Sequence, residues 1–331
     1  MTWKTDLEKN NTQKNGFKET TAPGTGQAES SNKAAAGLPK MEPTNGLNKS
    51  VFHGLWALTN KELKKWYKTP VLVLMTLVQP VLWLGLFGKA FNIGSIFSGS
   101  SFNIPGLNIP KAVLDQISNT IMLNTFGTTD YFSFLAVGML SFIVLFTAMF
   151  SGMSIVWDRR LGILNKVLST PVARGNVVVS KVFSSVIRSL IQAGIVLVIA
   201  VLFGMDVSHL SVLGILGSFT ALFLLCFGFS SIFIMLALRS SNQNTQMAII
   251  NLVNLPLLFG SNALFPSKFM PSWLQAFVNI NPISYATDAG RQLLLGATGM
   301  ATLTFDFMYL VAFAGIFAVI GIVLSWRYLT R

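Results

Sequence analysis

The residues that could carry out catalysis are few and scattered along this sequence. The acidic residues after position 50 all lie in polar segments or at the ends of apolar runs: Glu62, Asp115, Asp130, Asp158, Asp206, Asp288 and Asp306. His53 and His209 are far apart, and the single cysteine, Cys226, lies within an apolar run. Catalysis needs acids, histidines or nucleophile–base pairs that converge, and metal sites need closely spaced ligands. The sequence therefore predicts neither a catalytic site nor a metal site.

A second set of polar residues lies inside apolar runs. Lys181, Arg188 and Gln192 follow helical spacing on one face. A charge at membrane depth is expected to face protein or water, but Arg188 lies only about 10 Å beyond Lys181 and could instead snorkel to the interface. Asn251 and Asn254 could join helices by hydrogen bonds or contact a substrate. The candidates for a translocation path or a dimer interface are Arg188, Gln192, Asn251 and Asn254.

The elements that must position these residues are membrane helices. The chain has 331 residues, of which 52% are hydrophobic and 11% charged, and its mean hydropathy is +0.60. Soluble domains carry about 25% charged residues, so the composition predicts an all-α integral membrane protein. A spanning helix needs about 20 apolar residues. Six such transmembrane helices are predicted, over residues 70–90, 131–157, 177–204, 210–238, 247–264 and 306–326.

The distribution of basic residues predicts the orientation of these spans. If the N-terminus is cytoplasmic, 19 of the 24 Lys and Arg residues fall in inner segments, four in outer segments and one within a span. Basic residues accumulate on the cytoplasmic side of membrane proteins. We therefore expect both termini in the cytoplasm, and we expect a multi-pass protein of the plasma membrane. The net charge of +12 follows from this distribution and does not indicate nucleic acid.

The N-terminal region before the first span has two parts. Residues 1–49 are polar and poor in large apolar side chains, which predicts a disordered cytoplasmic tail. Residues 50–331 form the transmembrane domain. Its first segment, VFHGLWALTNKELKKWYKTP, places aromatic residues on one helical face and Lys61, Lys64, Lys65 and Lys68 on another. This pattern is typical of an amphipathic helix at the membrane interface, with lysines toward anionic lipid.

The segment between the second and third spans reads DRRLGILNKVLSTPVARG. Taken as one helix over residues 158–168, it has Leu161, Leu164 and Leu168 on one stripe. Asp158 near its start suits the helix dipole, and Pro171 ends it. This short cytoplasmic helix either lies on the membrane surface or docks on a cytoplasmic partner, and the periodicity does not distinguish the two.

The outer segment between the fifth and sixth spans is too polar and too rich in proline to span the membrane twice. Residues 272–296 predict short helices that are separated at Asn281 and Pro282. Asp288 and Arg291 are three residues apart and could pair on one helix face. That pair would be a surface ion pair or part of a gate.

These segments together resemble the permease subunit of an ABC-2 type exporter, of the daunorubicin-resistance kind. The short cytoplasmic helix matches the family pattern at Asp158, Arg159, Gly162, Leu164, Leu168, Pro171 and Arg174. Residues 78–91 resemble the family's first span. The outer segment matches at Pro266, Pro271, Trp273, Asn281, Pro282, Tyr285, Asp288 and Arg291. The resemblance covers residues 51–331, and one departure is Asn165, where many members carry Glu.

The resemblance implies a mechanism. In that family a separate ATPase subunit binds the short cytoplasmic helix, two permeases pair with two ATPases, and the outer helices dip back into the membrane. The implied coupling residues are Asp158, Arg159, Gly162, Leu164, Leu168 and Pro171, and the implied outer re-entrant residues are Asn281, Pro282, Tyr285, Asp288 and Arg291. ATP and Mg²⁺ would be held by the partner, because this sequence has no G-x-x-x-x-G-K-[ST] phosphate loop.

The function predicted from the sequence is therefore a permease subunit without enzymatic activity. It would move a hydrophobic or amphipathic drug, lipid or glycan out of the cytoplasm, with an ABC ATPase and a second permease copy or close relative as partners in the lipid membrane. The alternative is a channel or secondary transporter that works without an ATPase, which would need charges along a pathway through the spans. An intramembrane enzyme is disfavoured by the positions of the acids.

Overall fold

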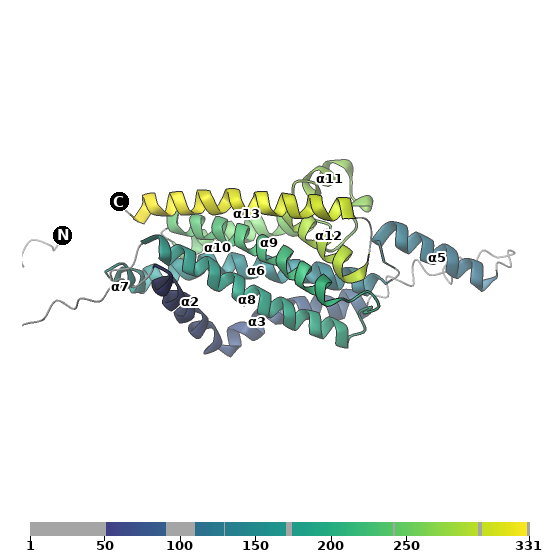
Figure 1. The fold of residues 1–331 in the computed structure, drawn as a ribbon, viewed down its shortest axis with the longest axis horizontal. Coiled ribbons are helices and arrows are strands. Elements are labelled where there is room, and N and C mark those ends of the chain that lie inside the picture. Colours follow the sequence, from purple (N-terminus) through teal and green to yellow (C-terminus); the bar gives the residue numbers. More distant parts are fainter. Residues whose placement is uncertain are drawn as a thin grey trace, which may run out of the picture. The chain divides into compact units, whose positions relative to one another are not determined.

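The computed structural model describes residues 51–90, 110–128, 130–169, 174–240, 242–296 and 300–329. Throughout these ranges the only regular secondary structure is helical, as the sequence predicts. The predicted tail, residues 1–49, lies outside the described residues. The long helices are α6 (Tyr131–Arg160), α8 (Arg174–Leu202), α9 (Val212–Arg239) and α13 (Met300–Leu329), and they run side by side (Figure 1).

Four described helices, α6, α8, α9 and α13, are long and apolar enough to cross a bilayer. They correspond to the second, third, fourth and sixth predicted spans. The first predicted span is a shorter apolar helix, and the fifth is α10 (Gln243–Phe259), with 17 residues. Six complete spans are therefore not confirmed, although several apolar helices fit an integral membrane protein.

Proline explains why the first predicted span is irregular. It consists of α3 (Pro70–Trp83), which contains Pro80, and a π-helical segment, η2 (Leu84–Ala90). A proline inside a helix removes one backbone hydrogen bond and clashes with the preceding turn. The helix then changes from α to π geometry at Leu84, which is a second irregularity in this span. α10 likewise contains Pro256 and ends at Gly260.

The centre of the fold is α6. Every residue from 131 to 145 is buried, because α8, α9, α10 and α12 (Pro282–Leu295) all pack against it. Two glycines permit close backbone approach. A Cβ at Gly138 would lie 2.0 Å from the carbonyl oxygen of Ala263, and one at Gly152 would lie 2.5 Å from that of Phe233. A helix that is apolar all round is expected in such a position.

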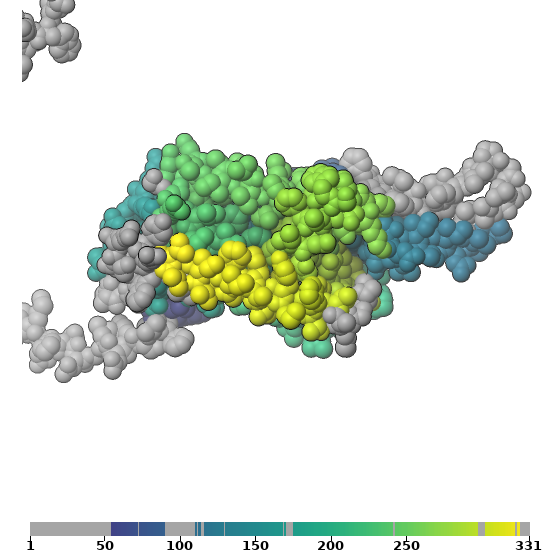
Figure 2. Space-filling model, turned by 90° about the horizontal axis from the view of Figure 1, so that it is seen from above, coloured from purple at the N-terminus to yellow at the C-terminus, as the bar shows by residue number. Residues whose placement is uncertain are grey.

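α13 forms an outer face of the bundle (Figure 2). It packs on α9 and α12, while apolar side chains along its length remain exposed: Phe305, Met308, Val311, Ile316, Val319 and Val323. An exposed apolar stripe of this length suits contact with lipid tails or with another membrane protein.

The N-terminal helix α2 (Val51–Tyr67) forms where the sequence predicts an amphipathic helix, but its faces differ from the prediction. It packs along α8 and buries Thr59 and Glu62, while Trp56 and Tyr67 are exposed. The hydropathy pattern missed this face because its buried residues are polar, and Glu62 is paired with Lys181 of α8.

The short helix predicted between the second and third spans also differs from the prediction. α6 continues through Arg160, and α7 (Ile163–Leu168) begins only after a turn at Leu161 and Gly162. Gly162 has φ +69°, a left-handed conformation that glycine adopts without a steric penalty. A single helix over residues 158–168 is therefore wrong. Asp158 belongs to the long helix, and the turn separates Leu161 from Leu164.

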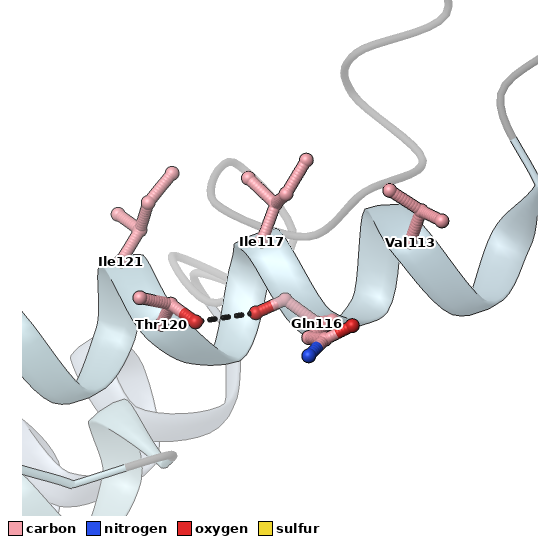
Figure 3. Close-up of a pocket in the computed structure, with 5 residues that line it drawn as sticks. All are labelled: Val113, Gln116, Ile117, Thr120 and Ile121. Atoms are coloured by element: carbon pink, nitrogen blue, oxygen red, sulfur yellow. Dashed lines mark hydrogen bonds between the residues drawn. The ribbon is translucent and has the colours of Figure 1, made fainter.

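One described helix has no counterpart in the sequence prediction. α5 (Lys111–Phe126) precedes α6 and ends at Gly127, which is left-handed. Figure 3 shows Val113, Ile117 and Ile121 along one side of α5, with Gln116 and Thr120 on another. The Thr120 hydroxyl donates to the Gln116 carbonyl at 2.8 Å. The remaining short helices, η4 (Ser267–Phe269) and α11 (Ser272–Val278), lie in the segment that leads to α12.

Candidate functional site

Two acids and two lysines form an ion cluster at the end of the bundle that carries α7. Lys181 Nζ lies 2.6 Å from Asp158 and 3.3 Å from Glu62, and Lys65 Nζ lies 2.9 Å from Asp158 and 3.5 Å from Glu62. Lys181 also donates to the Ser154 hydroxyl at 3.2 Å. This cluster of Glu62, Lys65, Asp158 and Lys181 ties α2, α6 and α8 together.

Burial makes these contacts strong. The Lys181 side chain is 4% exposed and that of Asp158 is 10% exposed, so water screens this pair poorly. Lys65 is at the edge, with a side chain that is 42% exposed. Partial burial alone would lower the pKa of Lys65, but the carboxylates of Asp158 and Glu62 outweigh it and raise the pKa above its ordinary value.

Arg159 holds the neighbouring helix. Its guanidinium donates to the carbonyl oxygens of Leu238 at 2.9 Å and Ser240 at 3.2 Å. These carbonyls lie at the C-terminal end of α9, where backbone acceptors lack intrahelical partners and a cation is favourable. Arg160 donates to Gln243, at the start of α10, at 3.3 Å. The end of α6 is thus fixed to α2, α8, α9 and α10.

α7 is attached to this fixed end by the two-residue turn. Leu164 is 5% exposed, whereas Leu161 is 70% exposed, so the predicted leucine stripe is not one docking face. Asn165 and Lys166 are exposed on α7. The side chain of Leu168 and all of Pro171 lie outside the described residues. Of the six coupling candidates, Asp158 and Arg159 hold α6 in place, and Gly162 shapes the turn.

A cavity of about 280 Å³ lies between α2, α3, α6 and α8. Arg188 and Gln192 both line it, together with the aromatic side chains of Trp66, Phe146, Phe150 and Trp157. Gln192 is held firmly: its amide nitrogen donates to the Thr76 hydroxyl at 2.6 Å, and its amide oxygen accepts from Thr147 at 2.6 Å. The spacing of Arg188 and Gln192 on one helical face indicated a shared location, which the cavity confirms.

Asn251 and Asn254 are not part of this cavity. Asn251 is exposed on α10, in a row at four-residue spacing with the exposed residues Met247, Leu255 and Phe259. Asn254 is partly buried, and its amide oxygen has no hydrogen-bond partner among the described residues. The four candidates for a path or an interface therefore divide into two pairs at different places.

The residues predicted for the outer segment lie together around α12. Asn281 caps two helices, since its amide nitrogen donates to the carbonyls of Leu257 and Gly260 and its oxygen accepts from the amide of Ile283. Pro282 is the first residue of α12. Tyr285 stacks on Tyr309 of α13 with ring centroids 3.9 Å apart. These contacts connect the ends of α10, α12 and α13.

The predicted Asp288–Arg291 pair is present, at 3.5 Å. Arg291 is buried, and its Nη2 donates to the carbonyl oxygens of Phe134, Asn262 and Ala263 at 3.3, 3.0 and 3.2 Å. Its guanidinium also lies 3.5 Å from the centre of the Phe134 ring. Arg291 is therefore a buried link between α12, α6 and the loop after α10, and a plain surface pair is excluded.

Residues 53–295, well over half of the chain, match the family model described as ABC-2 type transporter. The chain belongs to the ABC-2 type transporter family. A protein named as a transport permease, ycf38, from Cyanophora paradoxa is 30% identical over 240 residues, which cover 72% of this chain and 73% of that protein. Its namesake from Pyropia yezoensis is 29% identical over 255 residues, covering 77% of this chain and 78% of the relative.

A further relative is the daunorubicin resistance ABC transporter permease protein DrrB1 of Streptomyces coeruleorubidus. It is 27% identical over 173 residues, which cover 52% of this chain and 61% of that protein. The resemblance stated from the sequence is thus confirmed at the level of the family. Family membership makes this chain a membrane permease of the ABC-transporter type.

Sequence reasoning missed several residues of these sites. From the sequence, Glu62 is identified only as one of the acids outside the spans, and Thr76 and Thr147 are not singled out. Lys181 and Gln192 could have signalled that buried partners exist, because buried charged and polar groups need hydrogen bonds. Which helices supply those partners depends on packing, and the sequence carries no direct sign of it.

Proposed function

We propose that this chain is the membrane-spanning subunit of an ATP-driven exporter of hydrophobic or amphipathic molecules. A separate ATPase would hold ATP and Mg²⁺ and would dock at the end of the bundle that carries α7. The observation that carries the proposal is the rigid attachment of α7. Its turn follows the end of α6, which is held by the ion cluster and by the Arg159 bonds to α9.

This attachment supports a lever mechanism. A force on α7 would act on α6 through the two-residue turn at Leu161 and Gly162. The ion cluster would transmit this force to α2 and α8. Packed elements that are rigidly joined respond as units. The same movement would change the walls of the cavity that contains Arg188, since that cavity lies between α2, α3, α6 and α8.

We base the proposed orientation on the distribution of Lys and Arg. The protein would lie in the plasma membrane, with both termini in the cytoplasm. The C-terminal end of α13 and α7 lie at the same end of the bundle (Figure 1), which agrees with this topology. An excess of Lys and Arg at that end supports a cytoplasmic location. The outer helices α11 and α12 would then face the opposite side and partly re-enter the membrane.

Leu161→Asp is the substitution that tests the docking site. Leu161 is 70% exposed, so its replacement removes apolar contact area from a partner without opening the fold. A fully buried leucine contributes about 1.5–3 kcal/mol, so we expect loss of ATPase co-purification and of stimulated ATP hydrolysis in reconstituted vesicles. Leu164→Asp is less informative, because Leu164 is 5% exposed and the change would also detach α7 from α6.

Asn165→Asp provides the matched control. It adds the same charge to an exposed position of α7, and it removes no apolar side chain. Binding and stimulation should stay close to those of the unaltered protein. If Leu161→Asp retained full binding and full stimulation, α7 would merely lie on the membrane and the coupling proposal would be lost.

We also propose that two permease copies, or this chain and a close relative, pair along α10. Asn251 lies among exposed apolar residues of that helix, and an amide that faced only lipid would lose its hydrogen bonds at considerable cost. Small and polar residues commonly join membrane helices. Asn251→Cys should therefore form a disulfide-linked dimer on mild oxidation in native lipid, whereas Met308→Cys, exposed on α13, should not.

A further inference from the structure

The cavity between α2, α3, α6 and α8 contains a single charged lining residue, Arg188. Its other polar lining groups are neutral, and Gln192 is already bonded on both sides of its amide. The cavity, at about 280 Å³, is close to the lower limit of about 300 Å³ for ligand pockets. It therefore has room for a headgroup and the first part of an apolar chain.

Arg188 differs from Arg159 and Arg291, the other arginines among the described side chains that are partly or fully buried. The terminal nitrogens of Arg159 and Arg291 donate to backbone carbonyls. Arg188 makes one hydrogen bond to a described residue, from Nε to the carbonyl of Ser184 at 3.1 Å. None of the ion pairs between described residues includes it. A guanidinium has five N–H donors, so four of them are available at the cavity.

The neighbouring acids cannot readily supply a partner. Glu62 and Asp158 are each engaged by Lys65 and Lys181 within the ion cluster. An arginine inside a membrane helix is costly unless it meets a counter-charge or water. Guanidinium groups bind phosphate and carboxylate through two parallel hydrogen bonds. An anion from outside the chain would supply Arg188 with a counter-charge and with hydrogen-bond acceptors.

The rest of the cavity is suited to an apolar body. Phe146, Phe150 and Trp157 form part of its wall. Met75 and Phe150, which also line it, are 66% and 41% exposed, so the cavity is bordered by side chains on the bundle surface. A molecule with its charged group at Arg188 could extend past them toward the lipid.

We propose that this cavity binds the anionic group of an amphipathic molecule, with Arg188 paired to its phosphate or carboxylate. The proposal deepens the proposed export function, since it assigns an anionic amphipath as the substrate class, but the binding itself requires no ATPase. Arg188 supplies the charge selectivity, Gln192 keeps α3, α6 and α8 in register, and the aromatic wall holds the apolar part.

Lipid binding to the purified full-length chain tests the proposal. Native mass spectrometry would measure retention of dioleoylphosphatidylglycerol, an anionic lipid, against dioleoylphosphatidylcholine, which has no net charge. We expect about ten-fold tighter retention of the anionic lipid, because a hydrogen bond between charged groups increases the affinity about ten-fold or more. Arg188→Gln should abolish the preference, and Arg188→Lys should keep most of it.

Arg160→Gln is the matched control, since Arg160 is an exposed arginine at the same end of the bundle and outside the cavity. It should leave the preference unchanged. If Arg188→Gln does not fold, Met75→Trp replaces an exposed lining residue and should weaken anionic-lipid retention by narrowing the cavity. Equal retention of the two lipids by the unaltered chain, a preference that persists in Arg188→Gln, or unchanged anionic-lipid retention in Met75→Trp would overturn the proposal.

Two further measurements separate the possible sources. Inorganic phosphate at millimolar concentration should fail to displace the lipid, and displacement would mean a site for small anions only. ATPase co-purification with Leu161→Asp reports on coupling alone. If the unaltered chain shows no charge preference while Leu161→Asp loses the ATPase, this inference is refuted and the proposed function stands. If the unaltered chain prefers the anionic lipid while Leu161→Asp keeps full ATPase binding, the function is refuted and the binding site stands.

Discussion

The ion cluster makes a quantitative prediction about stability. Asp158→Asn removes the carboxylate that lies 2.6 Å from Lys181 and 2.9 Å from Lys65. Removing one partner of a buried ion pair costs about 3–5 kcal/mol, while the contact to the exposed side of Lys65 contributes about 0–1 kcal/mol. Lys181 retains Glu62 at 3.3 Å and Ser154 at 3.2 Å. We therefore expect a loss near the lower limit, about 3 kcal/mol.

The companion substitution is Lys181→Met, which should cost a similar amount because it leaves two carboxylates sharing Lys65. The double variant keeps one acid and one base, Glu62 and Lys65, which are 3.5 Å apart, and its cluster is again neutral. Its loss should therefore be smaller than the sum of the single losses. The interaction energy of residues in one network is about 0.5–3 kcal/mol, and we expect about 2 kcal/mol here.

The assay is equilibrium unfolding in mixed micelles, followed by tryptophan fluorescence and helical circular dichroism for the four members of the cycle. Lys166→Met serves as the control partner, since Lys166 is exposed on α7 and outside the cluster. Its effect should add to that of Asp158→Asn. Additive losses for Asp158→Asn and Lys181→Met as well, with a coupling below about 0.5 kcal/mol, would refute the shared network.

Three other predictions concern packing, topology and assembly. Gly138→Ala should destabilise the fold by about 1–3 kcal/mol, because the new Cβ would lie 2.0 Å from the carbonyl oxygen of Ala263. Gly315 has open space around it, so Gly315→Ala should leave the free energy of unfolding unchanged or increase it in the same assay. Single cysteines at Ser169 and Ser267 should react with impermeant maleimide from opposite sides of the membrane, and labelling of both from outside would contradict the proposed orientation. The permease should be dimeric in native-lipid particles by mass photometry, and a monomer that transports with its ATPase would contradict the pairing.

Several features could be predicted from the sequence because their causes are local. Low charge and high hydropathy require a membrane environment, and there the backbone must satisfy its own hydrogen bonds, which favours helices. The Asp288–Arg291 pair follows from a spacing of three residues on one helix. The family pattern around residues 157–181 and 263–296 was also visible without coordinates. The coupling roles assigned to those residues stay predictions.

Predictions from local sequence patterns were wrong at several positions, which the structure of the surrounding helices explains. Asp158 was interpreted as a favourable charge at the start of a short helix, but it is near the end of α6, where two lysines bind it. Leu161 and Leu164 share a stripe only if the helix is continuous, and the left-handed Gly162 interrupts it. The prolines in α3 and α10 altered spans that hydropathy alone treats as complete.

The class of molecule can be predicted from the amino-acid sequence: a helical membrane permease of the ABC-2 type with a polar segment between two spans. Which polar groups contact one another depends on how the helices pack. Glu62 and Lys181 are 119 residues apart in the chain, and Arg188 and Trp66 line one cavity from different helices. Helices that are apolar on every side carry no periodic signal of which face is buried. Only their packing brings these side chains together, and it leaves the partly buried Arg188 facing a cavity, whereas the buried Lys181 and Arg291 are paired with acids.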